Sequence, residues 1–336
     1  MALEVAVTGP TGEIGKPLLE ELERRDEVGG VLGMARRAFD PAEEGWEKVS
    51  YRRGDILDRG ALAALFDGVD VAVHLAFAIF GSRDETRQVN LQGSRNVFET
   101  AIKAGVKRLV YASSVAAYGF HPGNPQPLSE DVPARGSEGF YYSRQKAELE
   151  DLLGELLSGS CVEAYVFRPC IVAGPRATML IEQTVETVRV GDPVPLLRKG
   201  VERLPLVAPI LPDPGTPIQL VHHDDVARAM AAAICGEGPP GVYNLAGKGE
   251  VQVRDIAREL GWRWVPVPRP AVSIGAAAAR RFSFASPKLE WAIAADTPVL
   301  MGTAKARQDL DWEPRHDAQE TLAETVAGAR AKGFLE

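Results

Sequence analysis

Residues 3–15, LEVAVTGPTGEIG, decide the fold. The first six residues are an apolar run of strand length, glycines follow at positions 9, 12 and 15, and leucines at 18, 19 and 22 then give a helical pattern. Such glycines allow a tight turn and close approach of the backbone to a diphosphate, and the helix start offers free N–H groups to the anion. This G-x-x-G-x-x-G stretch predicts a dinucleotide-binding turn; the alternative is an ordinary glycine-rich turn.

Strand and helix patterns alternate along the N-terminal half. Short apolar runs without in-and-out alternation suit parallel strands buried on both faces, and right-handed crossovers arrange such strands as a doubly wound sheet. The sequence therefore predicts an α/β fold with a doubly wound parallel sheet of the Rossmann type. The expected strands are Leu3–Thr8, Val28–Ala35, Val69–Ala76, Arg108–Ser113 and Glu163–Arg168, and the expected helices are Lys16–Arg25, Ala61–Phe66, Glu85–Ala104 and Tyr142–Leu157.

The regular pattern fades after Pro175. Seven prolines in residues 193–217 are too many for a helix or a central strand. Pattern returns at Ile218–Val221, Asp224–Ile234 and Val242–Ala246. We therefore expect a dinucleotide-binding domain at residues 1–175 with returning segments at about 216–246, and a smaller substrate-binding region at 176–215 and 247–336.

Composition excludes several classes of protein. A chain of 336 residues with 45% hydrophobic and 25% charged residues is not disordered, collagen-like or coiled-coil. Its net charge of −8 disfavours nucleic acid or an anionic membrane as a partner. Cys161, Cys170 and Cys235 form no CxxC pair, so neither a disulfide framework nor a metal site is expected.

No targeting segment is apparent near the start, where the apolar run leads directly into the glycine-rich turn. The longest apolar stretch elsewhere, Ala271–Ala279, is far shorter than the roughly 20 residues that span a bilayer. We therefore expect a cytoplasmic protein with a small-molecule substrate and no membrane partner.

The choice of cofactor depends on the end of the second strand. An acidic residue about 20 positions beyond the glycines binds the ribose 2′-OH of NAD, whereas NADP needs a cation for its 2′-phosphate. Here that position is Ala35, and Arg36 and Arg37 follow. A guanidinium can hold a phosphate with two hydrogen bonds, so the sequence favours NADP over NAD. The alternative is that both arginines are solvated loop charges.

Tyr142 and Lys146 form a Y-x-x-x-K pair, which places phenol and ammonium on one face of a helix. Lowering a tyrosine pKa from near 10 to neutrality needs about 4 kcal/mol, and we expect the Lys146 ammonium to supply part of it. Ser113 and Ser114 follow a buried strand at its carboxyl end, where doubly wound sheets bind ligands. They could hold a reacting oxygen or simply cap the turn.

These motifs together resemble an extended short-chain dehydrogenase/reductase of the NAD-dependent epimerase/dehydratase family. The matches cover most of the chain in the family's order. They are Thr8–Gly15 (TGPTGEIG), Gly54–Ile56 (GDI), His74–Ala76 (HLA), Asn90–Val97 (NLQGSRNV), Ser113-Ser114 with Tyr118-Gly119, Tyr142 with Lys146, Arg168-Pro169 with Gly174-Pro175, and Val221–Ala227 (VHHDDVA).

The resemblance implies a role for each matched position. Ser114 would hydrogen-bond the reacting oxygen, Tyr142 would act as acid and base, and Lys146 would bind the nicotinamide ribose and lower the Tyr142 pKa. The implied cofactor contacts are Gly9, Thr11, Gly12, Ile14 and Gly15 in the turn, Asp55 and Ile56 beside the adenine, Ala76 and Phe77 beside the ribose, and Pro169 and Cys170 near the nicotinamide. A homodimer through the helix beginning near Tyr142 is also a family expectation. The implied structural residues are Asn90 and Asn96, and His222, His223, Asp224 and Asp225 at a helix start that joins two segments.

Two departures bear on the substrate. Ile171 and Ile218 stand where nucleotide-sugar epimerases of the family carry an Asn and an Arg for the substrate diphosphate. Val115 and Ala116 replace the Asp and Glu of the sugar dehydratases, so elimination of water has no obvious proton source. The aliphatic run Leu204–Leu211 could roof a less polar pocket or be plain packing.

The sequence thus leaves three functional hypotheses. The leading one is an NAD(P)-dependent oxidoreductase that moves hydride between a secondary alcohol or ketone carbon and nicotinamide, with a lean towards a reductase or dehydrogenase. The first alternative is a nucleotide-sugar epimerase that keeps its NAD bound. The second is a non-catalytic NADP(H)-sensing protein, which would not need Ser114, Tyr142 and Lys146 together.

Overall fold

The computed structural model describes residues 2–79, 81–190, 209–268 and 297–335. The expected irregular segment is therefore described only from residue 209 onward, and Ala271–Ala279 and residues 204–208 lie outside the described ranges. No helix in the described ranges is long and apolar enough to cross a membrane.

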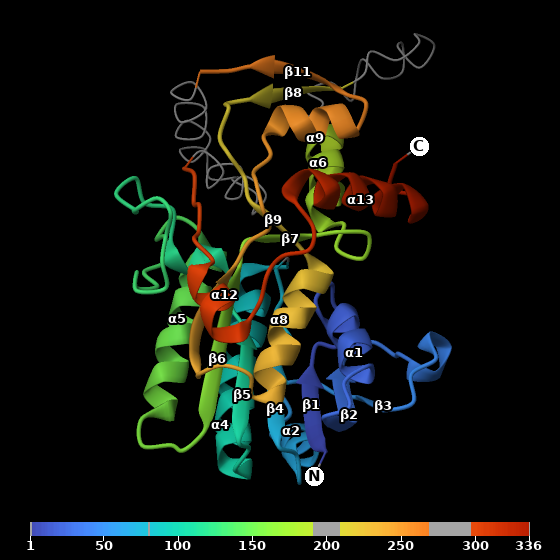
Figure 1. Cartoon of the computed structure of the whole chain (residues 1–336), viewed down its shortest axis with the longest axis vertical. Coiled ribbons are helices and arrows are strands. Elements are labelled where there is room, and N and C mark those ends of the chain that lie inside the picture. The colour runs from blue at the N-terminus through green and yellow to red at the C-terminus, as the bar shows by residue number, and fades with distance from the viewer. Residues whose placement is uncertain (1, 80, 191–208, 269–296, 336) are drawn as a thin grey trace.

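A parallel sheet is the centre of the molecule (Figure 1). Seven strands of the described chain pair in the order β10-β6-β5-β4-β1-β2-β3, with β1 in the middle part between β4 and β2. From β1 the chain adds β2 and β3 on one side and β4, β5 and β6 on the other. At such a change of direction a doubly wound sheet has a crevice at its carboxyl edge. These strands are β1 (Leu3–Thr8), β2 (Val28–Ala35), β3 (Val49–Arg53), β4 (Val71–His74), β5 (Arg108–Ala112), β6 (Glu163–Pro169) and β10 (Gly241–Leu245).

Helices cover both faces of this sheet. Leu18, Leu22 and Met230 belong to a buried cluster on one face, and Phe66 and Phe98 to a separate cluster on the other. This explains why the strands are apolar on both sides. The helices on the first face are α1 (Gly15–Glu23) and α8 (His223–Cys235), and those on the second are α2 (Arg59–Phe66), α4 (Ser94–Ala104) and α5 (Tyr141–Leu157).

A second layer lies beyond the carboxyl edge of the sheet (Figure 1). Its two small parallel sheets pair β7 with β9 and β8 with β11. Its elements are β7 (Ile171–Ala173), α6 (Met179–Val190), β8 (Ile210–Asp213), β9 (Leu220–His222), α9 (Val253–Glu259), β11 (Arg263–Pro266) and α13 (Ala318–Ala331). The remaining short elements are η1 (Pro41–Glu44), α3 (Arg83–Arg87), η2 (Gln88–Gly93), η3 (Val115–Tyr118) and α12 (Ala304–Leu310).

The fold class predicted from the sequence is confirmed, with several local differences. The expected helix 85–104 begins at Arg83, passes through a π-helical turn at Gln88–Gly93 and ends at Gly105, whose φ of 75° closes it. Strand β3 and helix α6 were not expected. Pro212 lies in β8, which belongs to a two-stranded sheet. Both strands of such a sheet are edge strands, where proline is tolerated because its missing N–H faces away from the partner strand.

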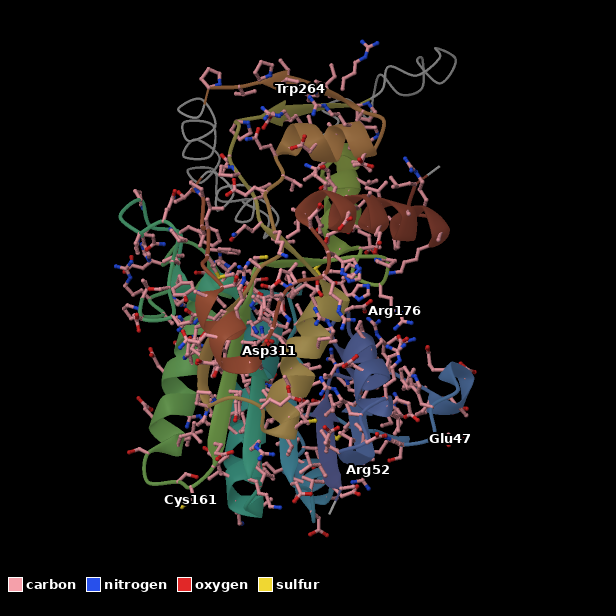
Figure 2. The ribbon with its side chains drawn as sticks, in the orientation of Figure 1. Glu47, Arg52, Cys161, Arg176, Trp264 and Asp311 are labelled. Atoms are coloured by element: carbon pink, nitrogen blue, oxygen red, sulfur yellow. The ribbon has the colours of Figure 1, made fainter. Side chains whose placement is uncertain are left out.

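The cysteines are free and spread over the molecule. Cys161 is exposed near β6, at the opposite end of the sheet from the second layer, while Trp264 of β11 lies in that layer (Figure 2). The second layer therefore caps only the carboxyl edge of the sheet, where the glycine-rich turn also lies.

Candidate active site

The glycine-rich turn joins β1 to α1, and its backbone needs glycine at two points. Gly9 has a φ of 76°, and a Cβ on it would lie 2.6 Å from the Ala76 backbone nitrogen. A Cβ on Gly15 would lie 2.5 Å from the Pro10 carbonyl oxygen. No side chain in the described chain caps the start of α1 at Ile14. The Lys16 N–H donates to the Gly12 carbonyl at 3.2 Å and Pro17 has no N–H, so Gly15 is the residue in the first turn of α1 whose N–H is available to an anion, and the turn fits a dinucleotide diphosphate.

A single cavity of about 660 Å³ begins at this turn. Every residue to which the sequence assigned a cofactor or catalytic role lines it. They are Gly9, Thr11, Gly12, Ile14, Gly15, Arg36, Arg37, Asp55, Ile56, Ala76, Phe77, Ser114, Tyr142, Lys146, Pro169 and Cys170. Residues separated by up to 161 positions, Gly9 to Cys170, therefore meet at the carboxyl edge of the sheet.

Arg36 and Arg37 follow β2 at one end of the cavity and are exposed. The backbone beneath them is fixed: the Tyr51 hydroxyl donates to the carbonyls of Ala35 and Arg37, and Arg53 Nε donates to the Arg36 carbonyl at 2.9 Å. Within the described ranges neither guanidinium has an ion-pair partner. Both can therefore meet an anionic ligand.

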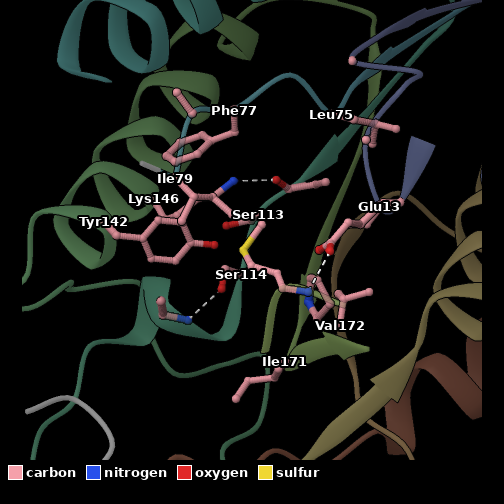
Figure 3. A pocket seen from close by; sticks show the side chains of 18 of the residues that line it. Glu13, Leu75, Phe77, Ile79, Ser113, Ser114, Tyr142, Lys146, Ile171 and Val172 are labelled. Carbon is pink, nitrogen blue, oxygen red and sulfur yellow. Dashed lines mark hydrogen bonds between the residues drawn. The ribbon is translucent and has the colours of Figure 1, made fainter. Parts of the chain in front are cut away.

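Ser114 and Ser113 follow β5 but have different partners. Ser114 Oγ accepts the Ala116 N–H at 3.2 Å, which caps η3, and is also hydrogen-bonded to the Tyr142 hydroxyl. Ser113 Oγ donates to the Glu150 carboxylate. Figure 3 shows the Tyr142 hydroxyl turned towards Ser114 inside the cavity. Ser114 thus caps the turn and is hydrogen-bonded to the Tyr142 phenol.

Tyr142 does not have the lowered pKa that the Y-x-x-x-K spacing predicted. Burial raises the pKa of its phenol above the usual range, while the Ser114 hydrogen bond acts in the opposite direction. Its ring packs edge-on against Phe77, with centroids 5.5 Å apart. The phenol is therefore in its neutral, proton-donating form at physiological pH.

Lys146 is buried one helical turn after Tyr142. Its Nζ donates to the Ala112 carbonyl at 2.8 Å and lies 4.0 Å from the centroid of the Phe77 ring. Burial lowers the pKa of this amine to about 7, and the Glu150 carboxylate raises it. The Lys146 side chain is thus held by the Ala112 carbonyl and the face of the Phe77 ring.

The second layer supplies an apolar stretch of the cavity wall. Ile171 and Ile218 both line the cavity, so the two positions that carry diphosphate ligands in nucleotide-sugar epimerases hold aliphatic side chains at the site itself. The other wall residues from residue 171 onward are Val172, Met179, Leu180, Gln183, Thr216, Pro217, Gln219, Thr297, Pro298 and Val299. None of these described residues is charged.

The expected apolar roof at residues 204–211 is only partly described. Ile210 and Leu211 belong to β8, which pairs with β11, and they are not among the described residues that line the cavity. Residues 204–208 lie outside the described ranges. The apolar wall comes instead from β7, the start of α6 and residues 216–219.

His222 and His223 form a helix start, as the sequence suggested. His222 Nδ1 accepts the Asp224 N–H at 3.2 Å, so its Nε2 carries the proton and donates to Glu324 at 3.0 Å. His223 Nε2 accepts the Arg176 N–H at 3.2 Å. Two backbone N–H groups therefore occupy the ring lone pairs that a metal ion would need.

Asp225, in the first turn of α8, also joins two segments of the chain. It is fully buried and accepts the N–H groups of Arg315 and His316 at 3.0 to 3.1 Å, and it pairs with Arg228. The residues just before α13 are thereby attached to the start of α8. The sequence could not locate this partner segment, because nothing in the residues near 225 signals a contact 90 positions away.

Glu13 is a site residue that the sequence reasoning did not single out. It lines the cavity within the glycine-rich turn, and its carboxylate accepts the Met179 N–H at 3.0 Å (Figure 3). The available signal was its position between Gly12 and Ile14, which puts an acid beside an anion site. Its partner, the first residue of α6, could not be found because α6 was not expected.

Known proteins resemble this chain, one over nearly its whole length and another over half of it. It is 27% identical over 352 aligned positions to the 3 beta-hydroxysteroid dehydrogenase/Delta 5→4-isomerase of Mycobacterium tuberculosis, a match that covers 96% of this chain and 89% of that protein. It is 33% identical over 175 residues to sterol demethylase protein B of Methylococcus capsulatus, covering 50% and 51% of the two chains.

A solved structure shares the fold. The Bordetella bronchiseptica enzyme WbmG, crystallised in complex with NAD, superposes with a TM-score of 0.71 at 21% identity, covering 100% of this chain and 96% of that one. The family model described as the NAD dependent epimerase/dehydratase family matches residues 5–246, which contain the glycine-rich turn, Ser114, Tyr142 and Lys146. The chain belongs to the NAD-dependent epimerase/dehydratase family.

Proposed function

We propose that this protein is an NADP-dependent reductase or dehydrogenase that interconverts an apolar, uncharged ketone and the corresponding secondary alcohol. One observation carries the proposal. Ser114 and Tyr142 are hydrogen-bonded to each other in one cavity. This cavity runs from the glycine-rich turn to the second-layer wall, whose described residues carry no charged side chain.

The residue roles follow from the contacts. Pro169 and Cys170 would lie beside a bound nicotinamide, which would supply or accept the hydride. As the carbonyl carbon is reduced, its oxygen gains negative charge, which the Ser114 hydroxyl stabilises by a hydrogen bond. Tyr142 donates its proton to that oxygen, a role suited to a phenol whose pKa burial keeps high. In the reverse direction, the deprotonated form, the Tyr142 phenolate, takes the proton of the alcohol.

Arg36 and Arg37 support the preference for NADP. Both are exposed at the cavity end and lack an ion-pair partner in the described ranges, so they are available to a 2′-phosphate. The family name specifies NAD, and the choice of the phosphorylated cofactor rests on these two side chains alone.

The cavity wall supports an apolar substrate. Burying a substrate diphosphate without a cation would leave its charge uncompensated, whereas an apolar ring system gains about 25 cal/mol for each Å² removed from water. The full-length relative from Mycobacterium tuberculosis carries the name of a hydroxysteroid dehydrogenase, which agrees with this wall.

The test is net cofactor turnover with a matched substrate panel. The protein is incubated with NADPH and, separately, with NADH, together with polycyclic ketones, small polar ketones or UDP-sugars. We expect steady oxidation of NADPH with an apolar ketone and little with the polar ones. Conversion of a UDP-sugar without net redox change would overturn the proposal in favour of an epimerase, and cofactor binding without any turnover would favour a sensor.

A further inference from the structure

Glu13 joins the glycine-rich turn to the second layer. It is the only acidic residue in Thr8–Gly15, and its half-buried carboxylate forms part of the cavity wall beside Gly12. Oε1 accepts the N–H of Met179, the first residue of α6, at 3.0 Å (Figure 3). The first turn of α6 itself lines the cavity. One carboxylate therefore lies between the expected diphosphate site and the wall of the substrate pocket.

The charges around Glu13 do not neutralise it. Glu182 on α6 repels it, and Lys332, just after α13, attracts it more weakly. Lys332 Nζ instead donates to Thr178 Oγ1 at 2.8 Å. In the described chain no guanidinium or ammonium lies within ion-pair distance of Glu13. Burial is the largest effect and raises the pKa of this carboxyl from 4.5 to about 7, against the hydrogen bonds from the backbone of Met179 and Thr178.

We propose that Glu13 makes dinucleotide binding proton-linked: the bound diphosphate drives a proton from solvent onto the Glu13 carboxyl, which in its neutral form still accepts the Met179 N–H. The inference rests on the proposed cofactor site. The physical cause is repulsion, since a diphosphate and a carboxylate on the same short loop in a partly dry cavity destabilise each other. A neutral carboxyl removes the repulsion and keeps α6 attached.

The consequence is a defined pH dependence of cofactor affinity. The free protein has a Glu13 pKa of about 7, and the bound diphosphate raises it further. Below pH 6 the carboxyl is neutral in both states and affinity does not change with pH. As the pH rises through 7, the free protein loses its proton before the complex does, so the dissociation constant increases. Each unit by which the diphosphate raises the Glu13 pKa weakens cofactor affinity at high pH about tenfold.

The experiment measures NADH binding by calorimetry between pH 6 and pH 9, at each pH in two buffers of different ionisation enthalpy. NADH is the probe because the 2′-phosphate of NADPH itself titrates near pH 6. We expect the dissociation constant to rise about tenfold across the range, with proton uptake greatest between pH 7 and pH 8. In Glu13→Gln, which keeps the acceptor for Met179, the rise of the dissociation constant with pH and the proton uptake should both become clearly smaller than in the wild type, and what remains comes from Lys146, whose pKa is about 7.

Two matched variants separate charge from structure. Glu20→Gln removes the α1 carboxylate that pairs with Arg176, which Figure 2 labels between α1 and the second layer, and should keep the wild-type pH dependence. Glu182→Gln removes the repelling neighbour, so the transition should move to lower pH. This second variant also carries the test if Glu13→Gln fails to fold.

The outcomes distinguish this inference from the proposed function. A wild-type affinity that is constant from pH 6 to pH 9, or a Glu13→Gln protein that keeps the slope, would overturn the proton linkage while leaving ketone reduction intact. Failure of the wild type to bind either NADH or NADPH would overturn both.

Discussion

The Arg168 guanidinium on β6 lies against the Glu150 carboxylate on α5, with Nε 3.1 Å from each carboxylate oxygen. Their side chains are only 5% and 8% exposed. Ser113 also donates to Glu150, and the guanidinium lies 4.3 Å from the centroid of the Tyr118 ring. Because Glu150 comes one helical turn after Lys146, this buried pair sets the charge balance beneath the proposed catalytic residues.

Removing one partner of the pair should destabilise the protein strongly. Arg168→Met leaves a buried carboxylate without its cation, which costs about 3–5 kcal/mol. Replacing both residues, Arg168→Met with Glu150→Met, should recover most of the loss because no charge remains. Urea unfolding of the wild type, the single and the double variant measures this. A single variant within 1 kcal/mol of the wild type would contradict the prediction.

Glu150 should also control the charge of Lys146. Its carboxylate raises the pKa of that amine, so Glu150→Gln should lower the pKa below its value of about 7. The ammonium exists only below its pKa, and the high-pH limb of kcat/KM should therefore move to lower pH. Glu148→Gln, an exposed carboxylate on the same helix, is the control and should leave the profile in place.

Tyr142→Phe should abolish turnover while it preserves cofactor affinity. The variant keeps the ring that packs against Phe77 and loses only the hydroxyl bonded to Ser114. Loss of a general acid typically reduces the rate by about 10²–10⁴-fold. Steady-state rates and NADPH titrations are compared for both proteins. An active Tyr142→Phe protein would require a different proton donor.

The double variant Arg36→Ser with Arg37→Ser should lose its preference for the phosphorylated cofactor. Hydrogen bonds to a charged group contribute about 1.5–3 kcal/mol, so KM for NADPH should rise by about tenfold or more. KM for NADH should change little because it has no 2′-phosphate. Equal effects on the two cofactors would show that the arginines do not contact that group.

Stability should decline as the pH falls below about 6. His74 is buried, bonded to Thr8 Oγ1 at 2.7 Å and Ser94 Oγ at 2.8 Å, and burial lowers its pKa from 6.5 to about 3. Between these values the unfolded chain binds a proton that the folded chain does not. The free energy of unfolding should therefore fall by up to ~1.4 kcal/mol per pH unit from this group. The lowered pKa of His222 acts in the same direction.

Urea titrations at pH 7, 6 and 5 test this prediction. A free energy of unfolding that does not change over this range would contradict it. In His74→Asn the free energy of unfolding should depend less on pH, provided that the variant still unfolds cooperatively at pH 7.

The sequence was most informative where the signal was local. Val28–Ala35 was predicted with the bounds of β2, and the expected helix Glu85–Ala104 ends at the same residue as α4. The cavity residues were also predictable, because the carboxyl ends of parallel strands and the turn after β1 must meet at one edge of the sheet.

The sequence failed where the partner lies far along the chain. Helix α6 and its contact with Glu13 join residues 166 positions apart, and the attachment of Asp225 to His316 spans 91. The pKa of Tyr142 could not be inferred from helical spacing, because burial, which only the assembled fold determines, raises it by more than the Ser114 hydrogen bond lowers it.

Strand β10 pairs with β6 although 71 residues separate Pro169 from Gly241. During synthesis, one edge of β6 therefore stays unpaired until β10 has been made. Exposed strand edges of this kind recruit other chains. A fragment that stops after β6 would keep the glycine-rich turn and the proposed catalytic residues Ser114, Tyr142 and Lys146, yet be prone to aggregate. The protein is therefore not divisible after β6, although all three of these residues precede that point.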